Sequence, residues 1–201
     1  MHKLLIATTN PGKLKEIKNV LIDLPLKLLT LKDLQITDEV IEDGQTFEEN
    51  AIKKAWFYSQ KSGLLTIADD GGLEIDALDG EPGVRSKRWA DDQENPTDEK
   101  LIEYTLGRLK GIPKEKRGAQ LRTVVALALP SGEIFTSEGK IRGMIAEKHA
   151  EKWTRGYPYR ALFYLSQIKK FYDEDAFSKK EREEYAHRVQ ALKKLRKIIL
   201  R

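Results

Sequence analysis

The 201-residue sequence predicts one α/β domain, a mixed β-sheet with helices packed against it. Short apolar runs alternate with longer stretches whose apolar residues recur every three or four positions, as in strands followed by helices. Two strand-like stretches flank Pro130–Gly132, which indicates a hairpin and therefore an antiparallel part of the sheet. No internal repeat, low-complexity tract or clear linker divides the chain, so we expect residues 1–201 to form a single domain.

The chain opens with a strand, a polar turn and a helix. Lys3–Ala7 is a short apolar run, and the helical pattern after the turn places Ile17 and Leu21 on one face. Lys27–Leu31 could form a second strand. This order predicts the opening half of an α/β unit.

A second helix is predicted to begin at a capping box. Thr46 can cap the helix, and Glu49, three residues later, can return a hydrogen bond to the cap. We expect this helix to end near Gly63 and a strand to follow at Leu64–Ala68. Asp69–Gly72 is predicted to interrupt that strand before it resumes.

The second half of the chain contains two predicted helices and the hairpin. Thr97 caps a helix that reaches Leu109, with acidic residues in its first turn. Gln120–Leu129 and Glu133–Arg142 are the two strands of the hairpin. Lys179–Leu200 is strongly periodic and predicts one long C-terminal helix.

The composition excludes several classes of protein. The chain has no cysteine, which excludes disulfides, thiol catalysis and zinc–thiolate sites. No apolar run approaches the roughly 20 residues of a membrane-spanning helix, and the first residues lack a signal-peptide layout, so we expect a cytoplasmic protein. The net charge of +4 is too mild to indicate nucleic acid binding by itself.

The polar turn Thr8–Lys13 is a candidate phosphate site. Unpaired backbone N–H groups, the positive end of a helix dipole and Lys13 would together attract an anion. The P-loop spacing is missing. An ordinary helix cap, with Asn10 as N-cap and Pro11 at the first helical position, is the alternative and is more frequent for so short a motif.

Asp69–Gly72 is a candidate metal or general-base site. Neighbouring residues of an extended chain face opposite sides, so we expect only one of Asp69 and Asp70 to enter a given site. A carboxylate there could hold Mg²⁺ or accept a proton from water. Gly71 permits close approach of a ligand. An Asp-Gly hairpin turn is the alternative.

The remaining candidates are weaker when each is taken alone. Glu49 could serve only the helix cap, and Lys54 could reach a phosphate or simply be solvated. Arg182, His187 and Arg188 could bind an anion or a base edge, or form a solvated helix face.

Taken together and in this order, the motifs resemble the inosine triphosphate pyrophosphatase family, which removes deaminated purine nucleotides. The resemblance covers nearly the whole chain, and its combination of motifs is specific. The matching stretches are Ala7–Lys13, Thr46–Ala51 with Lys54-Ala55, Ile67–Leu73, Gly80–Val84 with Ser86 and Arg88, and His187-Arg188 ahead of Ala191-Leu192.

The resemblance implies hydrolysis of ITP, dITP or XTP to the monophosphate and pyrophosphate with Mg²⁺. It implies a long mixed sheet with flanking helices in two lobes, a site in the cleft between them, and a homodimer. Glu49 and Asp70 would bind the metal, and Asp70 would also be the base that activates water. The implied substrate-binding residues are Thr8, Thr9, Asn10, Lys13, Lys54, Gly71, Tyr157, Arg182, His187 and Arg188.

The base-reading end departs from the family pattern. The family's Phe-Gly-Tyr-Asp-Pro segment is recognisable only as Gly156–Arg160, without its aspartate. Gly71 stands where the family has serine or threonine, Arg182 replaces a lysine, and Ala186 replaces a serine. Because arginine and histidine side chains donate hydrogen bonds, we expect a 6-keto purine to be preferred over adenine.

Three other functions are compatible with the sequence. A Maf-type pyrophosphatase acting on modified pyrimidine nucleotides matches the motifs less well. A basic nucleic-acid-binding module would use the C-terminal helix with Trp89 or Trp153, although the apolar stripe of that helix favours packing on a core. A catalytically inactive relative that only binds nucleotide is the third.

Overall fold

The computed structural model describes residues 2–91 and 96–199 and contains one seven-stranded sheet in the order β2-β1-β3-β4-β5-β6-β7. β1 pairs in parallel with both β2 and β3, whereas β5/β6 and β6/β7 are antiparallel, so the sheet is mixed as predicted. The strands are β1 (His2–Ile6), β2 (Leu26–Thr30), β3 (Leu65–Ile75), β4 (Gly118–Ala128), β5 (Ile134–Ile145), β6 (Phe163–Leu165) and β7 (Lys170–Phe171).

Helices flank the sheet, and their caps follow the sequence closely. Asn10, Thr46 and Thr97 are N-caps, and Gly63 ends its helix in the left-handed conformation. The α-helices are α1 (Pro11–Leu21), α2 (Phe47–Ser62), α3 (Asp98–Arg108), α4 (Lys179–Tyr185) and α5 (His187–Ile199). Short 3-10 turns occupy η1 (Asp76–Leu78), η2 (Gly83–Arg85), η3 (Lys114–Lys116) and η4 (Pro158–Ala161).

The chain divides into two compact units. The first contains the chain up to Asp70, Thr123–Gly139, and the chain from His187 onward. The second contains Gly71–Arg122 and Lys140–Ala186. β3, β4 and β5 therefore contribute residues to both units.

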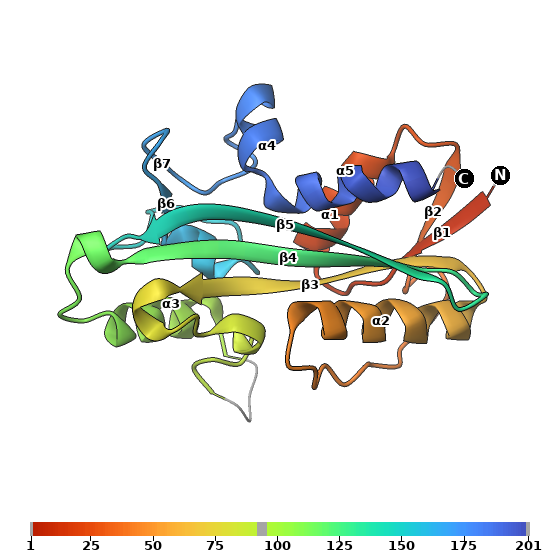
Figure 1. Cartoon of the computed structure of the whole chain (residues 1–201), viewed down its shortest axis with the longest axis horizontal. Helices are drawn as coiled ribbons and strands as arrows, with labels where there is room; N and C mark the ends of the chain where they lie inside the picture. The colour runs from red at the N-terminus through yellow and green to blue at the C-terminus, as the bar shows by residue number, and fades with distance from the viewer. Residues whose placement is uncertain (1, 92–95, 200–201) are drawn as a thin grey trace. The chain divides into compact units, whose positions relative to one another are not determined.

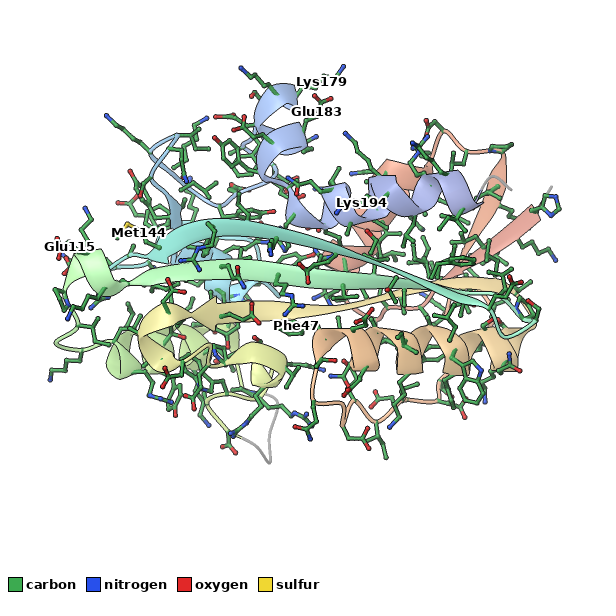
Figure 2. The ribbon with its side chains drawn as sticks, viewed as in Figure 1. Phe47, Glu115, Met144, Lys179, Glu183 and Lys194 are labelled. Atoms are coloured by element: carbon green, nitrogen blue, oxygen red, sulfur yellow. The ribbon has the colours of Figure 1, made fainter. Side chains whose placement is uncertain are left out.

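In the first unit, α1 and α5 lie side by side on one face of the sheet and α2 covers the other (Figure 1). The buried Phe47 begins α2, and Lys194 lies on α5 (Figure 2). Nζ of Lys194 donates to the carbonyl oxygen of Glu138 at 2.8 Å. The side chains of Leu4, Leu5, Ile17 and Ile67 are among those completely buried in this unit. The apolar stripe predicted for the C-terminal helix is also buried, so it packs on the core.

The second unit has its own apolar core, formed by the end of β3, α3, β6 and the segments around η4. Its largest fully buried side chains are Tyr172 and Phe163. α4 projects from this unit, with Lys179 and Glu183 exposed (Figure 2). Among residues 2–91 and 96–199, no helix is long and apolar enough to cross a membrane.

The predicted interruption of the third strand is wrong, because β3 runs without a break from Leu65 to Ile75. Its glycines serve close packing instead of a turn. A Cβ on Gly72 would overlap the hydroxyl of Ser86, whose Oγ accepts a hydrogen bond from the Leu73 amide at 3.0 Å. The alternative of an Asp-Gly hairpin turn is therefore also wrong.

The single C-terminal helix predicted from Lys179 is also wrong, because the helix breaks at Ala186, whose ψ is 89°. The predicted end at Leu200 lies outside the described residues. The start of the second piece, α5, rests directly on β5, since a Cβ on Gly139 would overlap the carbonyl oxygen of His187. Periodicity alone could not show this, because both pieces carry apolar residues at helical spacing.

The close approach at Gly139 gives a test of this packing. We expect Gly139→Ala to lower the free energy of unfolding by about 3 kcal/mol, because the backbone of α5 must move away. Gly107→Ala is the matched control: it lies in α3 with no atom near the new methyl group, and should raise stability by about 0.5–1 kcal/mol. Urea unfolding of both variants measures this. A Gly139→Ala protein as stable as wild type would contradict the contact.

Candidate active site

The turn Thr8–Lys13 forms the helix cap that the sequence offered as its alternative interpretation. Oδ1 of Asn10 accepts hydrogen bonds from the amides of Gly12 at 2.9 Å and Lys13 at 3.1 Å. The Asn10 amide donates to Oγ1 of Thr8 at 3.2 Å. The expectation that these amides are unpaired is therefore wrong for three of them. The side chain of Thr9 is exposed, and that of Lys13 is the charged group of the turn.

Asp69 and Asp70 are both buried, and they face opposite sides of β3. Asp69 contacts residues of α1 and α5, on one face of the sheet, whereas Asp70 contacts α2 on the other. This follows from the alternation of side chains along a strand. The two carboxylates therefore contact different helices, although the charges of Lys13 and Lys54 act on both.

Asp69 is the centre of a buried ion cluster. Its Oδ2 lies 3.1 Å from Nζ of Lys13, 3.1 Å from Nε of Arg188 and 3.4 Å from Oγ1 of Thr123. Burial alone would raise the pKa of Asp69, but the charges of Lys13, Arg188 and Lys54 outweigh it and hold that pKa far below its usual range. Oδ1 of Asp69 is buried and has no hydrogen-bond partner among the described residues.

Asp70 has the opposite electrostatic balance. Burial raises the pKa of Asp70 above its usual value, the charge of Glu42 adds to this, and Lys13 and Lys54 only partly oppose it. Its Oδ2 accepts a hydrogen bond from Nδ2 of Asn50 at 3.1 Å. A carboxylate that is harder to ionise than usual is better suited to take a proton from water.

Lys54, on α2, contacts both the Asp69 backbone and Glu42. Its Nζ donates to the carbonyl oxygen of Asp69 at 3.0 Å and lies 3.0 Å from Oε1 of Glu42. Burial lowers the pKa of Lys54, but Glu42, Asp70 and Asp69 outweigh this and raise it, so Lys54 is charged at neutral pH. A fixed ammonium group beside two carboxylates can bind a phosphate oxygen.

Glu49 does not complete the predicted capping box. Thr46 caps α2 by accepting from the Glu49 amide at 3.1 Å, but Oε2 of Glu49 accepts from the amide of Gln45 at 2.6 Å instead. The carboxylate of Glu49 lies at the exposed start of the helix. The backbone bends before the cap, so the amide one residue earlier is the one that Glu49 reaches.

Two residues of the site were not predicted from the sequence. Asn50 is buried, and its Oδ1 accepts from the amide of Gly44 at 2.8 Å, which turns its Nδ2 toward Asp70. The signal was a buried-face position of α2 that holds an amide instead of an apolar residue. Glu42 lies in an acidic loop with no periodicity, so its approach to Lys54 gave no sequence signal.

The other predicted site residues divide between the units. His187 and Arg188 are buried at the start of α5 in the first unit, where Arg188 also pairs with Glu16. Gly71, Tyr157 and Arg182 belong to the second unit. Arg182 donates to the carbonyl oxygen of Glu174 at 2.8 Å.

Asp70 can supply an oxygen ligand to a hard divalent cation. No group of three or more His, Cys, Asp or Glu side chains is arranged to hold a metal ion within residues 2–91 and 96–199. Mg²⁺ does not need such a group, because proteins commonly hold it with one or two carboxylates, water and substrate phosphates. Asp70 offers a buried oxygen donor for such an ion.

The contrast between the two aspartates predicts opposite effects on stability. Asp69→Asn removes the buried carboxylate that pairs with Lys13 and one of the two that pair with Arg188, and we expect it to lower the free energy of unfolding by about 3–5 kcal/mol at pH 7. Asp70→Asn removes a carboxylate that is disfavoured by burial, so stability at pH 7 should be unchanged or higher.

The dependence of the free energy of unfolding on pH also distinguishes the two aspartates. The folded pKa of Asp69 is depressed, so its contribution is present above the unfolded value of about 3.9 and is lost as the pH falls below it. The folded pKa of Asp70 is raised, so the advantage of Asp70→Asn should shrink as the pH falls toward about 4. Urea unfolding from pH 7 to about pH 2 measures both, since the change for Asp69 falls below about pH 4. Equal destabilisation by the two variants would contradict the assignment.

The chain is similar to known proteins over nearly its whole length. The model of the Ham1 family matches residues 4–198. A protein of Bacillus subtilis named dITP/XTP pyrophosphatase is 40% identical over 199 residues, covering 99% of this chain and 98% of the relative. One of the same name from Geobacter sulfurreducens is 44% identical over 167 residues, covering 83% and 82%.

The fold is also similar to solved structures of Ham1 proteins. A HAM1 protein from Coxiella burnetii has a TM-score of 0.85 and 32% identity, covering 99% of this chain and 98% of that one. The Staphylococcus aureus Ham1 protein has a TM-score of 0.80 and 34% identity, covering 98% and 97%. The chain therefore belongs to the Ham1 family, which confirms the resemblance that its motifs indicated.

Proposed function

We propose that this protein hydrolyses non-standard purine nucleoside triphosphates, namely ITP, dITP and XTP, to the monophosphate and pyrophosphate. The observation that carries the proposal is the buried Asp70, with a raised pKa and with Lys54 and Lys13 acting on it. The similarity to relatives named dITP/XTP pyrophosphatase supports the substrate class. The buried position of Trp89, 5% exposed, speaks against the alternative of stacking on nucleic acid with that side chain.

Asp70 would act as the general base. It accepts a proton from a water molecule as the water oxygen attacks the α-phosphorus. The bond from that phosphorus to the bridging oxygen breaks, and pyrophosphate leaves. Lys13 and Lys54 would hold the negative charge on the phosphate oxygens, with Thr8, Thr9 and Asn10 shaping the turn around them.

Asp70 and a second acidic residue would hold Mg²⁺. When bound, the ion supplies positive charge against the triphosphate oxygens. The family resemblance implies Glu49 as the second ligand, and Glu42 is the other candidate, because its Oε1 lies 3.0 Å from Nζ of Lys54, which also binds the Asp69 carbonyl oxygen. The exposed Glu49, bonded to the Gln45 amide, is the weaker candidate.

The base would be recognised by Gly71, Tyr157 and Arg182, whereas His187 and Arg188 are buried and Arg188 is paired with Asp69 and Glu16. Arginine donates hydrogen bonds, and the keto oxygen at the purine 6-position accepts one, whereas adenine presents an amino donor there. We also propose that the protein forms a homodimer and is located in the cytoplasm. A monomer mass in analytical ultracentrifugation at micromolar concentration would refute the dimer.

The first test is pyrophosphate release from ITP, dITP, XTP, ATP, GTP, CTP and UTP with Mg²⁺. We expect ITP and XTP to exceed ATP by at least about 100-fold in kcat/KM, since unpaired polar groups disfavour the wrong base. Asp70→Asn should lose at least about 100-fold in kcat, since it removes the base. Release from a modified pyrimidine instead would favour a Maf-like activity, and no release would favour a binding protein.

A second test separates the two candidate metal ligands. Glu42→Gln should raise the Mg²⁺ concentration for half-maximal rate by about tenfold or more, because one carboxylate ligand is lost. Glu49→Gln is the matched variant and should leave that concentration close to the wild-type value. The reverse result would favour Glu49, the ligand that the family resemblance implies.

A further inference from the structure

A buried cation in the second unit has no part in the chemistry described above. The guanidinium carbon of Arg160 lies 3.7 Å from the ring centroid of Tyr157 and 4.9 Å from that of Tyr172. Only 8% of Arg160 is exposed. A planar guanidinium stacked on aromatic faces attracts both rings and holds their orientation.

Glu174 supplies the opposite charge. Its Oε1 lies 3.2 Å from Nη2 of Arg160 and accepts the hydroxyl hydrogen of Tyr172 at 2.7 Å. Its backbone carbonyl oxygen accepts from Nη2 of Arg182 at 2.8 Å. Glu174 is also 8% exposed. The Glu174 carboxylate thus holds Arg160, which stacks on Tyr157, and the backbone of the same residue holds Arg182.

The segment that carries Tyr157 is held from several sides. The Arg160 amide donates to the carbonyl oxygen of Tyr157 at 3.1 Å, closing the turn η4. The Gly156 amide donates to Oδ2 of Asp98 at 2.7 Å, and the hydroxyl of Tyr159 donates to the Ser86 carbonyl oxygen. The Tyr157 ring is half-buried, with Arg160 stacked on it.

We propose that Arg160 and Glu174 are positioning residues for base recognition, which hold Tyr157 and Arg182 ready for a purine ring. This rests on the proposed function, in which those two residues contact the base. A buried ion pair contributes little net stability but can fix one arrangement of its neighbours. Immobilising the contact residues before the substrate arrives lowers the entropy cost of binding.

The two products of the proposed reaction, IMP and pyrophosphate, allow binding of the base to be measured separately from binding of the phosphates. Isothermal titration calorimetry with IMP and, separately, with pyrophosphate in the presence of Mg²⁺ would be run on wild type, Arg160→Lys and Glu174→Gln. We expect both variants to weaken IMP binding by about tenfold and pyrophosphate binding by less than about twofold. In steady-state kinetics KM for ITP should rise about tenfold with kcat little changed.

Arg155→Lys is the matched control, because Arg155 is an exposed arginine of the same segment. It should leave both affinities unchanged. Thermal unfolding is recorded for each variant, and if the Arg160 and Glu174 variants do not fold, Tyr172→Phe takes their place. This change removes only the hydroxyl that Glu174 binds, and it should still weaken IMP binding selectively.

Equal losses of IMP and pyrophosphate affinity, or unchanged IMP affinity, in the folded variants would overturn the inference. A wild-type protein that binds pyrophosphate but not IMP would overturn it and leave the phosphate chemistry standing. A wild-type protein that binds neither and hydrolyses no triphosphate would overturn the proposed function as well.

Discussion

The carboxylate of Asp69 is buried among Lys13, Arg188 and Thr123, and these partners come from α1, α5 and β4. A charge removed from water in this way is tolerated only when opposite charges are close. The two cations meet that condition, and Arg188 also pairs with Glu16 on α1. The cluster therefore joins the first and last helices of the chain to the middle of the sheet in the first unit.

The next residue along the strand depends on this arrangement. The charges of Lys13 and Lys54 act on both aspartates, and Arg188 adds its charge at Asp69, whereas at Asp70 burial outweighs the lysines and the pKa stays raised. Asn50 orients its carboxylate, and Lys54 is held by Glu42 and the Asp69 carbonyl oxygen. Strand alternation thus divides two adjacent aspartates into a structural anion and a candidate base.

The second unit shows how a departure from the family pattern can be accommodated. The segment Gly156–Arg160 lacks the family aspartate, yet its arginine is neither exposed nor isolated. Arg160 takes its counter-charge from Glu174, which also holds Tyr172 and Arg182. The altered segment is therefore a packed network and not a degraded one.

The sequence by itself determined the mixed α/β class, the main helices and their caps, the hairpin, and the family, because these depend on local periodicity and short motifs. Asn10, Thr46 and Gly63 act at their helix ends as their local patterns predicted. Long-range contacts decided the rest. The path of β3 through Gly72 depends on Ser86, and the start of α5 depends on Gly139, both far away in the sequence.

The site divides in the same way. Lys13, Lys54 and Asp70 could be chosen from motifs, but the roles of Glu42, Asn50 and Glu174 depend on which side chains burial brings within hydrogen-bond distance. The opposite ionisation of Asp69 and Asp70 likewise could not be read from two identical neighbouring residues. It depends on the charges that each face of the strand meets, and only the tertiary structure sets those.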